Sequence, residues 1–245
     1  MKSVAIMGGS GGIGAALIEQ LLARDDIALI HASARRRVPD SAGIAAADEK
    51  NTGRLRWTLF DATDESAVES WVKGLGSVDW LINCVGLLHD DNARPEKSIG
   101  QLDPQHFLRS MQVNTLPTLL LGKHALPALR QSPAAVFASI SARVGSIEDN
   151  ALGGWYSYRS SKAALNMSLK CLAIEWARSA SNVRVAALHP GTTDTALSMP
   201  FQRNVPAGKL FSPAKTARLL IEQIECLHDR PSGRFIAYDG EEIPW

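Results

Sequence analysis

The chain has 245 residues, a length at which an α/β protein usually forms one domain with a large core. Its charges nearly cancel, with 26 Lys and Arg against 25 Asp and Glu, and no apolar run approaches the roughly 20 residues of a membrane span. Nucleic acid and membranes are therefore not expected as partners. The three cysteines lack C-x-x-C spacing and the six histidines lack ligand spacing. We expect free thiols, no metal site and a reducing, cytoplasmic location.

A glycine-rich turn stands near the N-terminus, between an apolar strand at 3–7 and an apolar-periodic helix at about 12–24. Gly8, Gly12 and Gly14 permit a tight turn and let bare backbone approach a pyrophosphate at the helix N-terminus. A flexible surface loop is the alternative reading of such a run, and the position between strand and helix disfavours it. The residues of this turn that we expect to bind a dinucleotide are Gly8, Ser10, Gly11, Gly12, Ile13 and Gly14.

Strand-like and helix-like segments alternate along nearly the whole chain. The strands are near-continuous runs of Val, Ile, Leu and Ala, typical of strands buried on both faces of a parallel sheet. We predict strands at 3–7, 27–33, 55–60, 78–82, 134–140, 183–189 and 234–238, and helices at about 12–24, 64–74, 103–130, 155–180 and 213–228, with a weaker helix within 35–54 and an irregular loop at 192–212. Asp103-Pro104 and Ser212-Pro213 are typical helix starts. The fold predicted is α/β: one domain over 1–245, a single Rossmann-type doubly wound parallel sheet with helices on both faces.

The end of the second strand indicates which dinucleotide is bound. No Asp or Glu occurs from Ile27 to Pro39, where an acidic residue would bind the ribose 2′-hydroxyl of NAD. Three arginines at 35–37 follow the strand instead, and guanidinium groups can clamp the 2′-phosphate of NADP. A solvated basic turn is the alternative for any one of them. We expect NADP(H) in preference to NAD(H), with contacts from Arg35 and Arg36, from Asp61 and Ala62 at the adenine, and from Asn83, Cys84, Val85 and Gly86 at the adenine ribose.

Tyr158 and Lys162 are four residues apart in the predicted helix 155–180, so their side chains share one helix face. A nearby ammonium, together with the positive nicotinamide of an oxidised cofactor, can lower the pKa of a phenol. Such a Tyr can exchange a proton with a carbonyl oxygen or an alcohol. A core Tyr beside an exposed Lys is the alternative. Tyr156 is a second choice for the acid, but it has no Lys four residues on.

Three further segments add polar groups to this set. Ser141 follows the strand 134–140 and so lies at the carboxyl edge of the sheet, where ligands bind in this fold, with Ser139 as the second choice. Asn114 lies inside the predicted helix 103–130, an unfavourable place for Asn unless its side chain has a role. The turn after the sixth strand suits a carboxamide or phosphate, and from it we expect cofactor contacts by Pro190, Gly191, Thr192 and Thr195.

Together, and in order along essentially the whole chain, these segments resemble the short-chain dehydrogenase/reductase superfamily. The resemblance implies that Asn114, Ser141, Tyr158 and Lys162 are the catalytic set and that Tyr158 and Lys162 also contact the cofactor. It makes Tyr158 the general acid/base, with Ser141 holding the substrate oxygen. Lys162 would lower the Tyr pKa and grip the nicotinamide ribose, and Asn114 would position a water. The sequence departs from the family at Met7, where Thr is usual, at Cys84-Val85, and in a longer interval between Ser141 and Tyr158.

Within the superfamily, segments 141–147, 153–166 and 238–245 look like the branch that contains C-factor and the sniffer-type carbonyl reductases. This likeness implies an NADP(H)-dependent carbonyl reductase that acts on a small-molecule carbonyl or alcohol, and a homo-oligomer (dimer or tetramer) is expected. A dinucleotide-binding signalling protein with little or no turnover is the main alternative, and a methyltransferase is disfavoured. Met199, Phe201 and Leu210 suggest an apolar lid for a hydrophobic substrate, or else ordinary packing.

Overall fold

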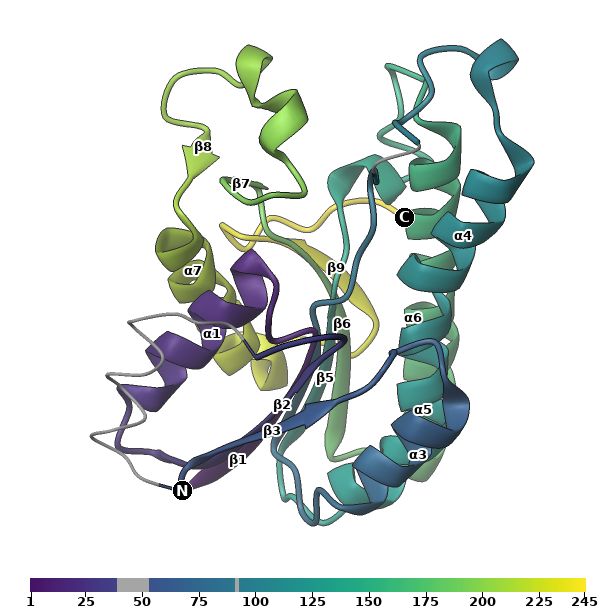
Figure 1. The fold of residues 1–245 in the computed structure, drawn as a ribbon. Coiled ribbons are helices and arrows are strands. Elements are labelled where there is room, and N and C mark those ends of the chain that lie inside the picture. Colours follow the sequence, from purple (N-terminus) through teal and green to yellow (C-terminus); the bar gives the residue numbers. More distant parts are fainter. Residues whose placement is uncertain (39–52, 91–92) are drawn as a thin grey trace.

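A parallel sheet forms the centre of the molecule. The computed structural model describes residues 1–38, 53–90 and 93–245, and in this part of the chain the sheet has seven strands in the order β3-β2-β1-β4-β5-β6-β9 (Figure 1). The strands are β1 (Lys2–Met7), β2 (Ile27–Ala34), β3 (Leu55–Leu59), β4 (Trp80–Asn83), β5 (Ala135–Ile140), β6 (Val183–His189) and β9 (Arg234–Ala237). The predicted strands and the predicted fold class are confirmed, with boundaries that differ by at most two residues.

Helices cover both faces of this sheet. One face carries α1 (Gly12–Leu22) and α7 (Pro213–Glu225), and the other carries α3 (Glu65–Lys73), α4 (Pro104–Asn114), α5 (Leu116–Leu129) and α6 (Tyr156–Ser179) (Figure 1). Successive residues of a strand point to opposite faces. In β1, Val4 and Ile6 therefore join the core beneath α1 and α7, whereas Ala5 and Met7 join the core on the other face. Because both cores are apolar, nearly every residue in the sequence of these strands is apolar.

The two predicted helix starts have the expected caps. The Asp103 carboxylate accepts a hydrogen bond from the Gln105 N–H at 2.9 Å, and the Ser212 hydroxyl accepts one from the Lys215 N–H at 3.2 Å. Each cap satisfies one of the N–H groups that the first turn of a helix leaves without a partner. The helix α4 thus begins where the sequence indicates, and so does α7.

The single helix predicted over 103–130 is two helices in the structure. The helix α4 ends at Asn114, Thr115 takes a φ of −111°, and α5 begins at Leu116. Pro117 has no N–H to donate to the carbonyl of Val113, and its ring crowds that carbonyl, which breaks the helix. Asn114 therefore lies at a helix end and not inside a helix.

The segment predicted as an irregular loop at 192–212 has some regular structure. Strands β7 (Thr192–Thr193) and β8 (Leu210–Phe211) pair in parallel and close the loop at its base, and the 3-10 helix η3 (Met199–Asn204) lies between them. Other short 3-10 helices are η1 (Ile99–Gln101), η2 (Arg143–Gly145) and η4 (Cys226–Asp229). The weaker helix expected within 35–54 falls mostly on 39–52, outside the described residues. Across the described residues, every helix is too short or too polar to span a bilayer.

The carboxyl ends of the central strands meet at one edge of the sheet. The chain order reverses between β1 and β4, which are neighbours in the sheet. Ligands bind in open α/β sheets at such a reversal, outside the carboxyl ends of the strands. The segments that follow β1, β4, β5 and β6 hold most of the residues predicted to bind cofactor or substrate.

Candidate active site

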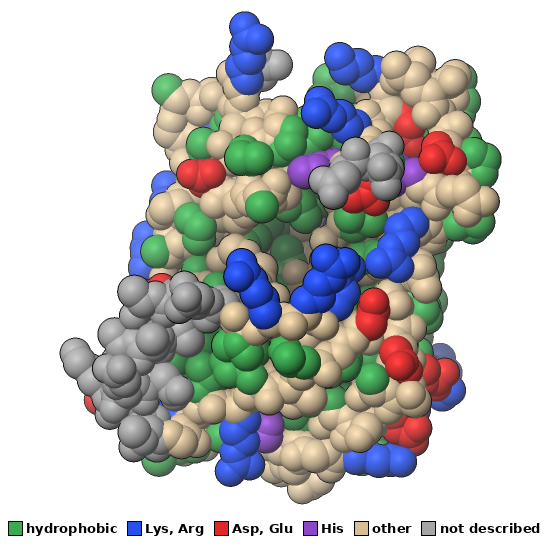
Figure 2. Space-filling model, viewed as in Figure 1, with side chains coloured by type: hydrophobic (Ala, Val, Ile, Leu, Met, Phe, Trp, Pro, Cys, Tyr) green, Lys and Arg blue, Asp and Glu red, His purple; other side chains and the backbone are tan. Residues whose placement is uncertain are grey.

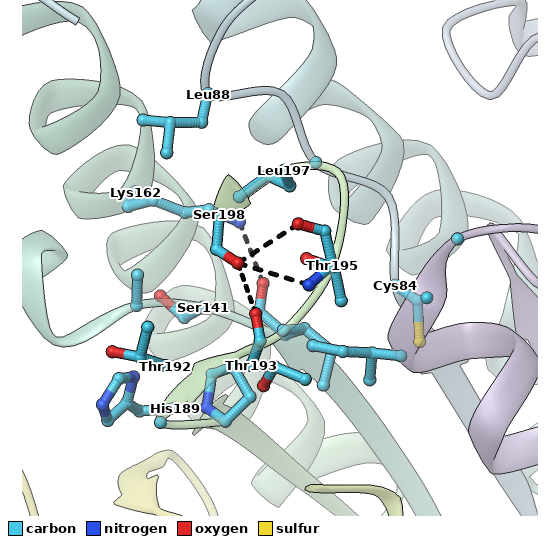
Figure 3. Close-up of a pocket in the computed structure, with 18 of the residues that line it drawn as sticks. Cys84, Leu88, Ser141, Lys162, His189, Thr192, Thr193, Thr195, Leu197 and Ser198 are labelled. Carbon is cyan, nitrogen blue, oxygen red and sulfur yellow. Dashed lines mark hydrogen bonds between the residues drawn. The ribbon is translucent and has the colours of Figure 1, made fainter. Parts of the chain in front are cut away.

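Two cavities open at this edge and adjoin one another. The first has a volume of about 480 Å³ and is lined by Ser141 and Lys162, which Figure 3 labels. Tyr158 lines it as well. The second has a volume of about 490 Å³ and lies beside the ends of β1, β2 and β3. Four residues line both cavities, namely Gly11, Cys84, Val85 and Gly86. The shared residues place the two cavities next to each other at this edge of the sheet.

The glycine turn between β1 and α1 has the backbone that the sequence predicts. Gly8 has a φ of +84°, which favours glycine, and a Cβ on Gly14 would collide with the carbonyl oxygen of Gly8. Ser33 on the neighbouring strand holds the turn, because its hydroxyl accepts from the Gly8 N–H at 3.3 Å and its carbonyl accepts from the Gly9 N–H at 2.8 Å. This serine supplies the hydroxyl that Met7 lacks.

The start of α1 is suited to a phosphate group. Gly11 precedes the helix without any side-chain cap, and the first turn contains no acidic residue. The N–H groups and the helix dipole at this end therefore favour an anion. A Cβ on Gly12 would lie 2.5 Å from the Thr195 methyl group, so the loop after β7 closes directly over the turn. Pro190, Gly191 and Thr192, also predicted to bind cofactor, line the first cavity with Thr195.

Three arginines line the second cavity. Arg35 and Arg36 follow β2 as predicted, and Arg109 reaches the cavity from α4, a residue that sequence reasoning missed. Figure 2 shows Lys and Arg side chains gathered beside a hollow in this face. Asp61 and Ala62 line the same cavity. The pKa of Asp61 is lowered mainly by the hydrogen bond that its carboxylate accepts from the backbone N–H of Thr63. The positive charges of Arg109 and Arg35 also lower it.

Asn83 and Ser139 lie in a buried network beneath the cavities. The Asn83 amide donates to the Thr118 hydroxyl at 2.8 Å and accepts from the Val85 N–H at 3.0 Å, and the Thr118 and Ser139 hydroxyls are 3.0 Å apart. Neither Asn83 nor Ser139 is among the described residues that line either cavity. The Asn83 side chain holds the turn after β4, and the expected approach of the 83–86 backbone to the adenine ribose stays a prediction. Of the two candidate serines, Ser141 is the one at the cavity.

Tyr158 and Lys162 share one face of α6 and are both buried. The Lys162 ammonium donates to the Ile140 carbonyl at 2.9 Å and lies 5.9 Å from the centre of the Tyr158 ring. Burial lowers the pKa of Lys162 to about 8, and burial raises the pKa of Tyr158 above its ordinary value. The lowering of the Tyr158 pKa that is expected from Lys162 together with an oxidised nicotinamide stays a prediction.

Asn114 is fully buried at the end of α4. Its amide donates to the Leu87 carbonyl at 2.8 Å and to the Ser161 hydroxyl at 2.9 Å, and it accepts from the Leu87 N–H at 2.7 Å. These bonds tie the segment after β4 to α6. Asn114 is not among the described residues that line the cavities. Its amide oxygen lies behind Gly86, 3.6 Å from where a Cβ on that glycine would be.

Trp155, Tyr158 and Phe201 line the first cavity, and of these three the sequence analysis did not single out Trp155. The Trp155 and Tyr158 ring centres are 6.2 Å apart, those of Trp155 and Phe201 are 5.1 Å apart, and those of Phe201 and His89 are 5.8 Å apart. Of the three residues of the suggested apolar lid, Phe201 lines the cavity, whereas Met199 is 66% exposed and Leu210 also lies outside the lining. No single periodic pattern marks these rings, since they come from separate segments of the chain, around 89, 155–158 and 201.

A buried carboxylate caps the helix that carries Tyr158. The Glu96 side chain accepts from the Ser157 N–H at 3.2 Å and from the Ser157 hydroxyl, and the Glu96 carbonyl accepts from the Trp155 N–H at 2.6 Å. Trp155, the residue before α6, has a left-handed φ of 52° and offers no side-chain cap. Glu96 therefore satisfies the Ser157 N–H in the first turn of α6 and the N–H of Trp155 just before the helix, and it places a negative charge at the positive end of the helix dipole.

His189 and the cysteines complete the polar groups near the site. His189 lines the first cavity, its Nδ1 accepts from the Arg143 N–H at 3.3 Å, and burial lowers the pKa of His189 to about 4. Cys84 lines both cavities, and burial raises the pKa of its thiol to about 12. All three cysteines are free, as predicted. The described residues contain no group of three or more side chains placed to bind a metal ion.

Comparison with known proteins identifies the family. The family model for short chain dehydrogenases matches residues 2–206. The chain is 34% identical over 170 residues to C-signal of Myxococcus xanthus, covering 69% of this chain and 94% of that protein. It is also 30% identical over 249 residues to 1-hydroxy-2-glutathionyl-2-methyl-3-butene dehydrogenase of Rhodococcus sp. (strain AD45), covering 100% of both.

Two solved structures share the fold over the full chain. The carbonyl reductase Sniffer of D. melanogaster superposes with a TM-score of 0.84 at 24% identity, covering 100% of both chains. An NADPH-bound carbonyl reductase from chicken fatty liver superposes with a TM-score of 0.83 at 23% identity, covering 100% of this chain and 99% of that one. With the family match over most of its length, the chain belongs to the short-chain dehydrogenase/reductase family of oxidoreductases, which use a nicotinamide cofactor.

Proposed function

We propose that this protein is an NADP(H)-dependent carbonyl reductase, with Tyr158 as general acid/base. One observation carries the proposal: Ser141, Tyr158 and Lys162, from two separate elements, line a single cavity that adjoins the glycine turn and the arginine-lined cavity. The Tyr exchanges the proton, and the other two groups surround the reacting oxygen.

The chain offers each end of the cofactor a matching site. The turn of Gly8, Gly12 and Gly14 admits a pyrophosphate where side chains would collide, and Arg35, Arg36 and Arg109 suit the dianionic 2′-phosphate of NADP. When bound, the reduced nicotinamide supplies a hydride to the carbonyl carbon. Lys162, buried beside Gly86, is the residue that we expect to hold the nicotinamide ribose.

The proton is supplied by the protein. Because burial raises the pKa of Tyr158, the phenol keeps its proton at neutral pH until a carbonyl oxygen gains negative charge beside it. The proton then passes from the phenol to that oxygen, which gives the alcohol and leaves a phenolate. The nearby Lys162 ammonium stabilises the phenolate, and Ser141 holds the substrate oxygen. Asn114, which was expected to position a water, is proposed to act here only by holding the segment after β4.

The walls of the first cavity favour a hydrophobic carbonyl compound. Trp155, Phe201, Leu88 and Val144 line it, and the aromatic contacts join Phe201 to Trp155 and Trp155 to Tyr158. Apolar surface of this kind binds apolar groups next to the reacting carbon and excludes water from the proton transfer.

The decisive experiment compares two tyrosines. Wild type is expected to oxidise NADPH with a panel of apolar aldehydes and diketones, and Tyr158→Phe should lower turnover by roughly 100-fold or more, since the general acid is lost. Tyr156→Phe is the matched control, because Tyr156 is two residues away, 37% exposed and outside the cavity lining. Steady-state rates of NADPH loss measure both.

Two results would contradict the proposal: no turnover across the panel, or a Tyr158→Phe enzyme as active as wild type. NADPH binding without any hydride transfer would instead favour the signalling alternative, to which the likeness to C-signal lends support.

The arginines test the choice of cofactor. Arg35→Gln and Arg109→Gln should each weaken NADPH binding by roughly tenfold, because each removes a charge-assisted hydrogen bond to phosphate, and should leave NADH binding unchanged. Arg37→Gln is the control, since Arg37 is exposed and is not among the residues lining the cavity. Fluorescence titration with both dinucleotides gives the dissociation constants. Equal weakening of NADPH and NADH would show that these side chains do not read the 2′-phosphate.

A further inference from the structure

The backbone is left-handed at the three residues before α6. Gly153, Gly154 and Trp155 have φ angles of 65°, 64° and 52°. In the part of the chain that the structure describes, Trp155 is the only residue other than glycine with a positive φ. A side chain makes this conformation unfavourable, whereas glycine adopts it without strain. Trp155 therefore needs surrounding contacts to hold it, as strained residues at functional sites do.

Glu96 supplies the backbone contact that holds Trp155. The Glu96 carbonyl accepts from the Trp155 N–H at 2.6 Å. The same carbonyl oxygen lies 3.3 Å from where a Cβ on Gly154 would be, so the left-handed turn packs directly against residue 96. Because this hydrogen bond joins two segments that are distant in the chain, it depends on residue 96 being fixed in place.

The carboxylate of Glu96 fixes that residue to α6. It accepts from the Ser157 N–H at 3.2 Å and from the Ser157 hydroxyl. Glu96 and Ser157 are 3% and 1% exposed, so water does not compete for these hydrogen bonds, and each is stronger than it would be at the surface. Glu96 thus binds the first turn of the helix through its side chain and Trp155 through its backbone.

The Trp155 ring held in this way borders the general acid of the proposed reaction. Its centre is 6.2 Å from that of Tyr158 and 5.1 Å from that of Phe201, and all three residues line the first cavity. Trp155 is only partly buried, so its side chain has surface left for a ligand. A substrate whose carbonyl oxygen meets the Tyr158 hydroxyl would have its substituents within reach of this ring. Aromatic surface there favours a flat ring as the substituent.

We propose that Glu96 is a positioning residue for Trp155, and that Trp155 makes the cavity prefer carbonyl compounds with a flat ring on the carbonyl carbon. The inference rests on the proposed function, because it names which carbonyl compounds that site prefers. Glu96 is not among the described residues that line either cavity, and it acts through Trp155.

The ratio of two Michaelis constants tests this assignment. Benzaldehyde and propanal both present an aldehyde to Tyr158, but only benzaldehyde has a flat ring. Trp155→Ala should raise the KM for benzaldehyde relative to that for propanal by roughly tenfold, because the contact with the indole is lost. Glu96→Leu should raise the same ratio by roughly three- to tenfold, because residue 96 is no longer fixed to the helix. Once Trp155 is Ala, Glu96→Leu should change the ratio no further.

Asp103→Ala is the matched control, because it also removes a carboxylate that caps a helix. Asp103 accepts from the Gln105 N–H at the start of α4 and is not among the described residues that line the cavities. This variant should lower the unfolding temperature without changing the ratio. An unchanged ratio in Glu96→Leu, or additive changes in the double mutant, would mean that Glu96 only stabilises α6 and would overturn the proposal.

Ser157→Ala keeps the test decisive if Glu96→Leu does not fold. It removes the hydroxyl that Glu96 binds and leaves the bond from the Ser157 N–H in place. The ratio of the two KM values should then rise by about twofold, as expected when one of two hydrogen bonds is lost. A ratio equal to that of wild type would refute the inference.

Crystal structures of wild type and Glu96→Leu give a readout that needs no turnover. Wild type should show Trp155 with a left-handed φ and its ring against Tyr158 and Phe201, and the variant should show the ring displaced. A Trp155 that keeps its φ and its place in the variant would contradict the positioning role of Glu96. A wild type without turnover, together with a displaced ring in the variant, would instead refute the proposed function alone.

Discussion

The proposed function depends on the protonation of Lys162 and Tyr158, and the fold buries both. Burial disfavours the charged form of each, which lowers the pKa of the amine and raises that of the phenol. For Lys162, keeping the proton at pH 7 in this setting costs on the order of 3 kcal/mol of folding free energy. Burial of the Lys162 ammonium therefore lowers the free energy of unfolding of the protein at pH 7.

Lys162→Met should unfold at a higher urea concentration than wild type at pH 7, although it should be inactive. The pKa of Lys162 is about 8 in the folded protein, whereas in the unfolded chain it has its ordinary value of 10.5. The unfolded state thus binds more protons between these values, and wild-type stability rises with pH there. The difference in unfolding free energy between Lys162→Met and wild type should therefore become smaller from pH 8 to pH 10.

Urea unfolding of wild type and Lys162→Met at pH 7, 8, 9 and 10 measures this difference in unfolding free energy. Lys97→Met, at an exposed lysine, is the control and should show no such trend. A difference that is the same at every pH would show that burial does not perturb Lys162.

At the scale of elements, η2 and α6 pack without space between them. A Cβ on Gly145 would lie 2.8 Å from the Lys162 Cβ and 2.9 Å from its carbonyl carbon, so only glycine fits. The same glycine supplies the carbonyl that receives the Asn166 amide. The short helix η2 after Ser141 therefore packs directly against α6 at Lys162.

Gly145→Ala should therefore lower the unfolding free energy by about 1–3 kcal/mol and reduce activity, because backbone must move apart to admit the methyl group. Gly100→Ala is the control, since a Cβ there would meet nothing within 4 Å. Denaturant unfolding and initial rates check both variants. Unchanged stability and activity in Gly145→Ala would contradict this account of the packing.

The elements that the sequence predicts well are those whose pattern has one physical cause. Strands such as β5 and β6 are apolar throughout because helices cover both faces, so their ends show clearly. The break between α4 and α5 was missed even though Pro117 marks it, because apolar residues continue on both sides and imitate one long helix. The pairing of β7 with β8 involves two residues from each strand, too few to give any periodic signal.

Over the whole molecule, the site draws on residues from Gly8 to Phe201, and the sequence predicts only part of it. Gly8, Ser141 and Tyr158 belong to motifs with a local spacing, and they can be recognised without a structure. Arg109 lines the second cavity because α4 packs near segments that are distant from it in sequence, and no local pattern records that packing. The expected homo-oligomer stays a prediction, to which the exposed Met167 and Ile174 on α6 lend some support.

The capping of α6 by Glu96 has a consequence for redesign. Segment 93–98 contacts Trp155, which lines the first cavity, and such a loop is one that an engineer would exchange to alter which compounds are accepted. Any replacement loop that omits a carboxylate at position 96 would leave the Ser157 N–H buried and unsatisfied, one residue before the acid. Grafts that transplant this loop between related reductases should therefore retain that side chain and vary only its surroundings.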